Sequence, residues 1–147
     1  MPTRPRTVLA SGVFDLLHPG HVFYLNRSRE LGDRLVVIVT CDEVARREKR
    51  EPVVAEGDRL SIIRALRVVD EAWLGCTGDR YTLVSRLRPD IIALGHDQKE
   101  DEQTLAAELK NHGIEAAIVR IEKYTGSLAS SSRMMHKVRT HAELTHH

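Results

Sequence analysis

The sequence contains few cysteines and few aromatic residues. Of its 147 residues, two are cysteine, Cys41 and Cys76, and 4% are aromatic. The two cysteines form neither a C-x-x-C pair nor the ligand spacing of a zinc site. The sequence therefore gives no support to a zinc fold or a dithiol redox centre. We expect both residues to be structural thiols in a reducing cytosol.

An excess of charge of one sign and long apolar runs are also lacking. There are 22 Lys and Arg against 21 Asp and Glu, a formal net charge of +1. This balance gives no reason to expect a nucleic-acid or membrane partner. The N-terminal "MPTRPR" lacks the apolar stretch of a signal peptide, and no apolar run approaches the ~20 residues that span a bilayer. We therefore expect a cytoplasmic protein.

Two familiar phosphate-binding fingerprints are absent. The chain has no G-x-G-x-x-G, which argues against a dinucleotide-binding redox domain. It also has no G-x-x-x-x-G-K-[ST], which argues against a P-loop kinase. Any nucleotide site in this chain must be built differently.

Short apolar runs alternate with helical patterns along the chain. The continuous runs are typical of strands buried on both faces of a parallel sheet, and the length fits one domain. We expect an α/β fold with a five-stranded parallel sheet and helices on both faces. The single domain covers 1–147, with a core at about 6–139 and a polar tail at about 140–147. The predicted strands are 7–10, 34–40, 71–75, 90–95 and 115–121, and the predicted helices are 19–31, 56–66, 81–88, 102–112 and 127–138.

Polar segments follow four of the predicted strands. They are "GVFDLLHPGH" at 12–21, "CDEVARREKR" at 41–50, "GHDQ" at 95–98 and "KYTGSLASSS" at 123–132. In open α/β sheets, ligands bind beyond the carboxyl ends of the strands. The four segments therefore predict one shared site at that edge of the sheet.

The segment "HPGH" is the most informative of the four. With Pro19 at the first helical position, His18 lies at the cap and His21 one turn on, so both imidazoles lie on one side of the helix start. Gly20 lets a ligand approach the backbone, and the helix N-terminus favours an anion. This pattern predicts a phosphate site. Two alternatives remain open: a capping turn with surface histidines, and a zinc site, for which no third ligand is evident.

The motif "GVFDLLHPGH" resembles the G-x-F-D-x-x-H-x-G-H signature of the cytidylyltransferase-like nucleotidyltransferases. Further segments resemble that family in order: "LGDRLVVIVTCDE", "AEGDRLSIIRALRVVDEAWLG" with its Glu56 and Arg59 pair, "PDIIALGHDQ" and "ASSSRMM". The resemblance covers Arg6 to about Arg139 and implies a Rossmann-like nucleotidyltransferase fold. It also suggests a homodimer.

Within that superfamily, residues 93–127 look most like the archaeal-type FAD synthases, which transfer AMP from ATP to FMN and release pyrophosphate. Glycerol-3-phosphate cytidylyltransferases carry R-T-x-G-I-S-T-T near their end, and the Arg-Thr pair is missing here. The resemblance therefore implies an FAD synthase that uses a divalent ion, with Mg²⁺ expected. The alternatives are a cytidylyltransferase acting on glycerol 3-phosphate or a similar phosphate, and a nucleotide-binding module without turnover.

The resemblance, which covers His18, His21 and Tyr124, and the position of the other polar segments at the strand ends together predict roles for individual residues. His18 and His21 are the expected catalytic donors to the phosphate oxygens. Val13, Phe14, Pro19, Gly20, Asp97 and Tyr124 complete the expected nucleotide site. Lys49, Arg50 and Arg59 are candidates for the acceptor phosphate or pyrophosphate, and Ser130, Ser131 and Ser132 for the β- and γ-phosphates. Simpler interpretations are core packing for Phe14, a turn for Asp97 and helix capping for the serines. The metal ligands are unknown.

Overall fold

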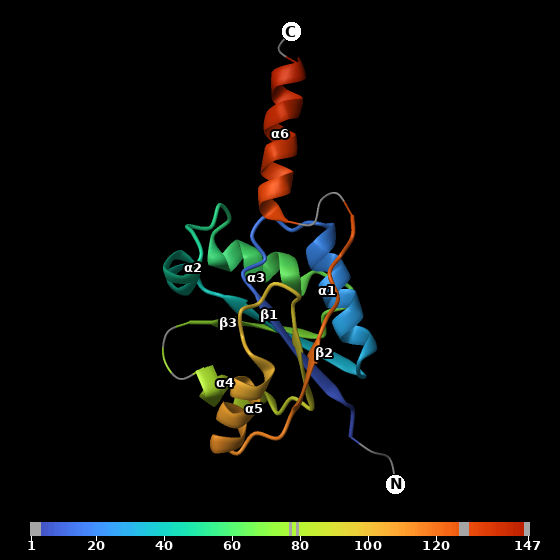
Figure 1. Cartoon of the computed structure of the whole chain (residues 1–147), viewed down its shortest axis with the longest axis vertical. Helices are drawn as coiled ribbons and strands as arrows, with labels where there is room; N and C mark the ends of the chain where they lie inside the picture. The colour runs from blue at the N-terminus through green and yellow to red at the C-terminus, as the bar shows by residue number, and fades with distance from the viewer. Residues whose placement is uncertain (1–3, 77, 79, 127–129, 146–147) are drawn as a thin grey trace.

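The computed structural model describes residues 4–76, 78, 80–126 and 130–145. Over these residues the predicted alternation of strands and helices is confirmed (Figure 1). The strands are β1 (Thr7–Gly12), β2 (Arg34–Thr40), β3 (Glu71–Gly75), β4 (Ile91–Leu94) and β5 (Ala117–Arg120). The helices are α1 (Pro19–Glu30), α2 (Asp42–Glu48), α3 (Glu56–Arg64), α4 (Arg80–Leu87), α5 (Glu102–Asn111) and α6 (Ser131–Thr145).

The five strands form one parallel sheet in the order β3-β2-β1-β4-β5. The chain builds outward from β1 to β3 and then returns to the other side of β1 with β4. The strand order therefore reverses between β1 and β4, and a crevice for ligands is expected at this point, beyond the carboxyl ends of both strands.

Alternate residues of the central strands enter two separate cores. Val8 and Ala10 of β1 pack on the side covered by α1 and α3, where Leu25 and Ile63 are fully buried. Leu9 packs on the opposite side, against residues of α4 and α5. The expected sheet with helices on both faces is thus confirmed, because the continuous apolar runs supply side chains to both layers.

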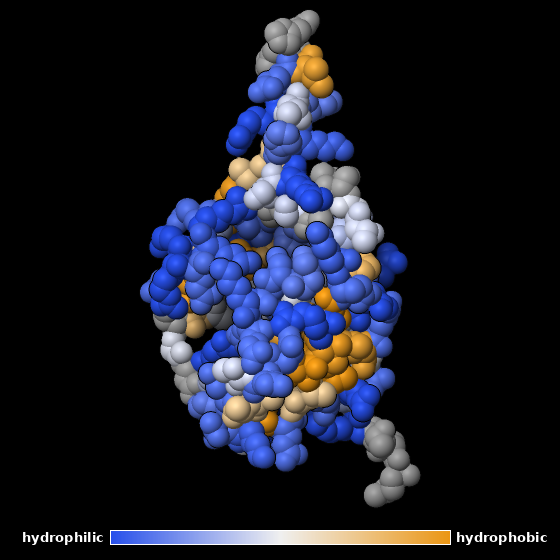
Figure 2. Space-filling view, viewed as in Figure 1, coloured by the Kyte–Doolittle hydropathy of each residue, from blue (hydrophilic) through white to orange (hydrophobic). Residues whose placement is uncertain are grey.

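Two helical segments differ from the sequence-based expectation. Helix α2 was not predicted as a helix, because its polar sequence fits a solvated loop equally well. Helix α6 continues through the expected polar tail as far as Thr145. It extends away from the body of the molecule as a mainly hydrophilic column (Figure 2). Residues 127–129, where this helix was expected to begin, and the terminal His146 and His147 lie outside the described residues.

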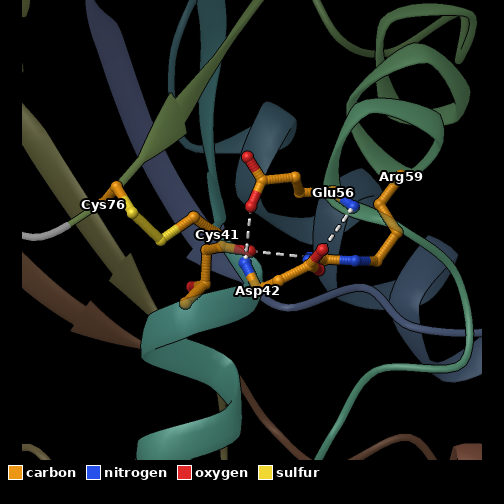
Figure 3. Close-up of a disulfide and its surroundings, with 6 residues drawn as sticks. Cys41, Asp42, Glu56, Arg59 and Cys76 are labelled. Carbon is orange, nitrogen blue, oxygen red and sulfur yellow. Dashed lines mark hydrogen bonds and ion pairs between the residues drawn. A yellow bond between two sulfur atoms is a disulfide. The ribbon is translucent and has the colours of Figure 1, made fainter.

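The expectation of two free thiols is wrong, because Cys41 and Cys76 form a disulfide (Figure 3). Cys41 follows β2 and Cys76 follows β3, and these strands are neighbours in the sheet. Their ends also share a backbone hydrogen bond from Cys41 N–H to the Gly75 carbonyl at 2.9 Å. The pairing depends on strand order, which the 35-residue separation does not reveal. It also removes the argument that free thiols gave for a reducing compartment.

In the part of the chain that the structure describes, no helix combines the length and the apolar character needed to span a membrane.

Candidate active site

The segment after β1 has an unusual backbone conformation. Phe14 and Leu16 have positive φ angles of 55° and 49°, a region that residues other than glycine rarely adopt and that recurs at functional sites. The Phe14 ring is buried in the core and lies edge-on to the His21 ring, with centroids 5.4 Å apart. The side chain of Phe14 therefore packs in the core, which agrees with the simpler interpretation given above. It also contacts the ring of His21.

The two histidines cap α1 reciprocally. His18 is the N-cap residue and Pro19 the first helical residue, as the sequence predicted. The His21 N–H donates to Nδ1 of His18 at 3.3 Å, and the His18 N–H donates to Nδ1 of His21 at 3.2 Å. The imidazole rings stack with centroids 3.6 Å apart. Because both Nδ1 atoms accept a hydrogen bond, each neutral ring carries its proton on Nε2.

The electrostatic surroundings keep both rings neutral. Burial, assisted by the neighbouring His18 and Lys49, lowers the pKa of His21 to about 3, against the opposing effect of Asp97 and Asp15. Burial also lowers the pKa of His18, and Asp97 again acts in the opposite direction. At neutral pH the site therefore offers two Nε2–H donors without two positive charges.

These donors belong to a cavity of about 260 Å³ at the carboxyl edge of the sheet. The cavity lies where β1 and β4 separate, as the strand-end pattern predicted. Eleven of the expected site residues line it: Val13, Phe14, His18, Gly20, His21, Lys49, Arg50, Asp97, Tyr124, Ser130 and Ser132. The structure brings these residues together, whereas their binding of substrate stays a prediction. Pro19 is not among the lining residues but starts the helix that carries them.

Arg59 does not belong to this cavity. Its side chain is fully buried, and its guanidinium donates to the carbonyls of Val13, Thr40 and Val54 at 2.7–2.8 Å and to Asp42 at 2.6 Å. Figure 3 shows this pairing beside the disulfide. The assignment of Arg59 to a substrate phosphate is therefore corrected: its donors are used to join the ends of β1 and β2 to α3.

Asp15 was missed by the sequence analysis as a site residue. It is 5% exposed, and its two carboxylate oxygens accept the backbone N–H groups of Val53 and Val54, each at 2.9 Å. Arg50 approaches the same carboxylate at 3.7 Å. Asp15 thereby fixes the segment after α2, which brings Lys49 and Arg50 to the cavity.

Tyr124 approaches the cavity from the segment after β5. Its ring lies 5.4 Å from that of Phe23 on α1. The backbone of Gly126 passes so close that a Cβ at this position would collide with the tyrosine ring. The ring is thus held between α1 and Gly126, with a place in the cavity wall where a base can stack.

The serines occupy different places at the start of α6. The Ser130 Oγ accepts the N–H of Arg133 at 3.2 Å and so caps the helix, as its simpler interpretation proposed. Ser130 and the exposed Ser132 both line the cavity. Ser131 is the first residue of α6, but its side chain lies outside the described part of the structure.

Arg120, at the end of β5, organises the loop that carries Asp97. Its guanidinium donates to the carbonyls of Gly95, Gln98 and Glu100 at 2.6–2.8 Å and pairs with Glu102. Nothing in the sequence distinguishes this arginine from the other arginines. Its role emerges only when β5 is placed beside β4.

The hydrogen-bond donors of the site are suited to bind an anion. They are less suited to coordinate a metal ion that is held by protein side chains alone. Over the described residues, no group of three or more His, Cys, Asp or Glu side chains is arranged to hold a metal ion. The zinc alternative for His18 and His21 therefore finds no third ligand in this part of the chain. Asp97 lies exposed at the cavity, and its carboxylate is of the type that can bind Mg²⁺.

Comparison with known proteins identifies the family to which the chain belongs. The model of the cytidylyltransferase-like family matches residues 9–137. A protein named FAD synthase from Methanothermus fervidus is 47% identical over 135 residues, which cover 89% of this chain and 93% of that protein. One from Thermoplasma volcanium with the same name is 49% identical, over 89% of this chain and 92% of its own length.

Solved structures agree with the fold. A crystal structure titled as the lipopolysaccharide core biosynthesis protein of Thermoplasma volcanium superimposes with a TM-score of 0.80 at 48% identity, covering 82% of this chain and 98% of that one. A pantoate-beta-alanine ligase from Francisella tularensis gives a TM-score of 0.60 at 13% identity, over 92% of this chain and 67% of the other. The second likeness concerns the fold alone.

Proposed function

Because the chain belongs to the cytidylyltransferase-like family, we infer that it is an FAD synthase, which transfers AMP from ATP to FMN and releases pyrophosphate. The observation that carries this inference is the near-complete match to proteins named FAD synthase at 47% and 49% identity. The cavity supports this inference, since its two uncharged Nε2–H donors at a helix start are suited to bind phosphate oxygens.

The reaction needs positioning more than proton transfer. A phosphate oxygen of FMN attacks the α-phosphorus of ATP in line, a new P–O bond forms, and the bond to the pyrophosphate oxygen breaks with its electron pair. The FMN phosphate already carries the negative charge, so no base has to remove a proton. The chain's task is to align the reactants and to stabilise the charge on the α-phosphoryl and leaving oxygens. His18 and His21 are the proposed donors.

The remaining roles follow from the cavity wall. Lys49, which lines the cavity, supplies an ammonium suited to the pyrophosphate or the acceptor phosphate. Ser132 supplies a hydroxyl beside the N-terminus of α6 for the terminal phosphates. Tyr124 supplies a ring face for a base.

Mg²⁺ is the proposed divalent ion. Asp97 is the residue that would hold it from the protein side, and the bound ion would supply positive charge to the triphosphate. A cytoplasmic location and a homodimer stay predictions.

Crossing two nucleotides with two acceptors tests the reaction. ATP and CTP are each incubated with FMN and with glycerol 3-phosphate in the presence of Mg²⁺, and the products are separated by chromatography. We expect FAD from ATP and FMN, with one pyrophosphate for each FAD. CDP-glycerol without FAD would favour the cytidylyltransferase alternative. Binding of nucleotide without any product would favour the module that lacks turnover.

A further inference from the structure

The two central strands separate just before the active site. β1 pairs with β4 through Val8–Ile91, Leu9–Ile92 and Ala10–Ala93. Its pairing with β2 continues further, to Gly12 and Val39. The gap between β1 and β4 therefore opens beyond Ala10 and Ala93, at the edge where the cavity lies.

Two side chains occupy the places of the next ladder hydrogen bonds. Continuation of the parallel ladder would join the Ser11 N–H to the Ala93 carbonyl, and the Gly95 N–H to the Ser11 carbonyl. In the structure, the Tyr24 hydroxyl accepts from the Ser11 N–H at 3.2 Å and donates to the Ala93 carbonyl at 2.6 Å. The Tyr24 hydroxyl thus replaces the first of the two missing bonds.

The Gln98 amide replaces the second. Its Oε1 accepts from the Gly95 N–H at 3.0 Å, and its Nε2 donates to the Ser11 carbonyl at 2.9 Å. A hydroxyl inserts one atom between the strands, whereas an amide inserts three. The strands therefore separate stepwise, and each backbone group facing the gap at Ser11, Ala93 and Gly95 keeps a hydrogen-bond partner.

This gap lies between the two halves of the site. The loop that carries His18 and His21 follows β1, and the loop that carries Asp97 follows β4. Gln98 itself lines the cavity, as does Tyr24. Both side chains are engaged with the backbone, so their roles there are to hold the strands and not to bind the nucleotide.

We propose that Tyr24 and Gln98 are positioning residues that set the separation of β1 and β4, and thereby the distance from the two histidines to a nucleotide bound beside Asp97. The proposal rests on the function inferred above. A displacement of about 1 Å in such a site costs on the order of 100-fold in rate, so the effect should appear in turnover more than in binding.

Tyr24→Phe and Gln98→Met remove one insertion each while keeping the size of the side chain. Tyr81→Phe and Gln103→Met are the matched controls, because they make the same chemical changes on α4 and α5. We expect roughly 10- to 100-fold lower kcat for the first pair, with the Kd for ATP within about threefold of wild type, and near-normal kcat for the controls. The double variant Tyr24→Phe/Gln98→Met should lose less than the product of the single losses, because both act on one gap.

A purely structural role would lower the unfolding midpoint but leave the kcat of the folded protein unchanged. Assays are therefore run well below the unfolding midpoint of every variant. Folded Tyr24→Phe and Gln98→Met proteins with kcat within about twofold of wild type would overturn the proposal.

A second measurement separates this proposal from the inferred reaction. The ¹⁵N shifts of the two histidine Nε2 atoms are followed by NMR as ATP is added, which needs no FAD formation. We expect shifts in the wild type and controls and smaller shifts in Tyr24→Phe and Gln98→Met. Absence of FAD from the wild-type reaction contradicts the inferred function. Identical Nε2 shifts in wild type and variants contradict the positioning role.

Discussion

Nδ1 of His18 and Nδ1 of His21 each accept the backbone N–H of the other residue, at 3.3 and 3.2 Å. This reciprocal cap ties the protonation of both rings to the start of α1. A proton added to either Nδ1 would take away the acceptor, so the structure that orients the rings also favours their neutral form.

His21→Gln separates catalysis from capping. Glutamine at the third helical position can return a hydrogen bond to the N-cap backbone, as in the usual capping box, but it places no imidazole in the cavity. We expect turnover to fall by about 100-fold or more, the effect of losing one preorganised donor, with little change in the unfolding midpoint. Steady-state FAD formation and thermal unfolding measure the two effects. Near-normal turnover in the folded variant would remove His21 from the mechanism.

The low pKa of His21 predicts a pH-dependent stability. Its folded pKa of about 3 lies below the ordinary histidine value of 6.5, so the unfolded chain binds a proton at this residue between these values and the folded chain does not. The free energy of unfolding should therefore fall as the pH drops from about 6.5 towards 3. Urea denaturation of wild type and His21→Gln at pH 7.5, 6 and 5 isolates this contribution. Equal pH dependence in the two proteins would contradict it.

Replacing Ser130, Ser131 and Ser132 together by alanine should weaken the binding of ATP more than that of FMN. The reason is that the three residues lie at the start of α6, where Ser130 and Ser132 line the cavity. Single variants divide the roles: Ser132→Ala should affect ATP binding, and Ser130→Ala should also destabilise α6 by about 1 kcal/mol through loss of its cap. Calorimetric titration with each substrate gives the answer. Unchanged ATP affinity in the triple variant would leave these residues with capping alone.

The disulfide should stabilise the fold by reducing the conformational entropy of the unfolded chain. Closure of a loop between residues 35 positions apart contributes about 3–4 kcal/mol in the chain-entropy model. Addition of a reductant should lower the free energy of unfolding of the wild type by about this amount. It should have no effect on Cys76→Ala, which serves as the matched control. A reductant effect of equal size in both proteins would show that it does not act through this disulfide.

Arg59→Met should destabilise the protein by roughly 3 kcal/mol or more. The change leaves three backbone carbonyls and Asp42 without the guanidinium that binds them. Arg47→Met, on the exposed side of α2, is the control for loss of a positive charge. Chemical denaturation measures both. If the inferred role of Arg59 is correct, any loss of activity in Arg59→Met should be proportional to the loss of folded protein. A raised KM with unchanged stability would instead indicate that Arg59 binds substrate.

The sequence predicted those features that local pattern determines. Continuous apolar runs indicated the parallel strands, and the spacing of His18, Pro19 and His21 indicated a helix start with two imidazoles on one side. The polar segments after the strands indicated the edge of the sheet that carries the cavity. These inferences need only the hydrophobic periods of helices and strands. They also use the rule that ligands bind beyond the carboxyl ends of parallel strands, which lie at one edge of the sheet.

Features that depend on strand order could not be predicted in this way. Tyr24 and Gln98 gain their roles because β4 lies beside β1, and Cys41 meets Cys76 because β3 lies beside β2. Arg59 was misassigned for a related reason. An arginine in a helix is usually solvated, and its full burial among carbonyls follows only from the convergence of three separate segments upon it.

The hydrogen bonds from Arg120 to the loop after β4 affect which substitutions this loop can accept during evolution. The guanidinium holds main-chain oxygens of Gly95, Gln98 and Glu100, and every residue type offers such an oxygen. Mutations at the exposed positions of His96 and Asp97, which line the cavity, can therefore alter its chemical lining while the course of the loop persists. The chemistry of this part of the cavity wall can thus change by single substitutions, as long as residue 120 remains arginine.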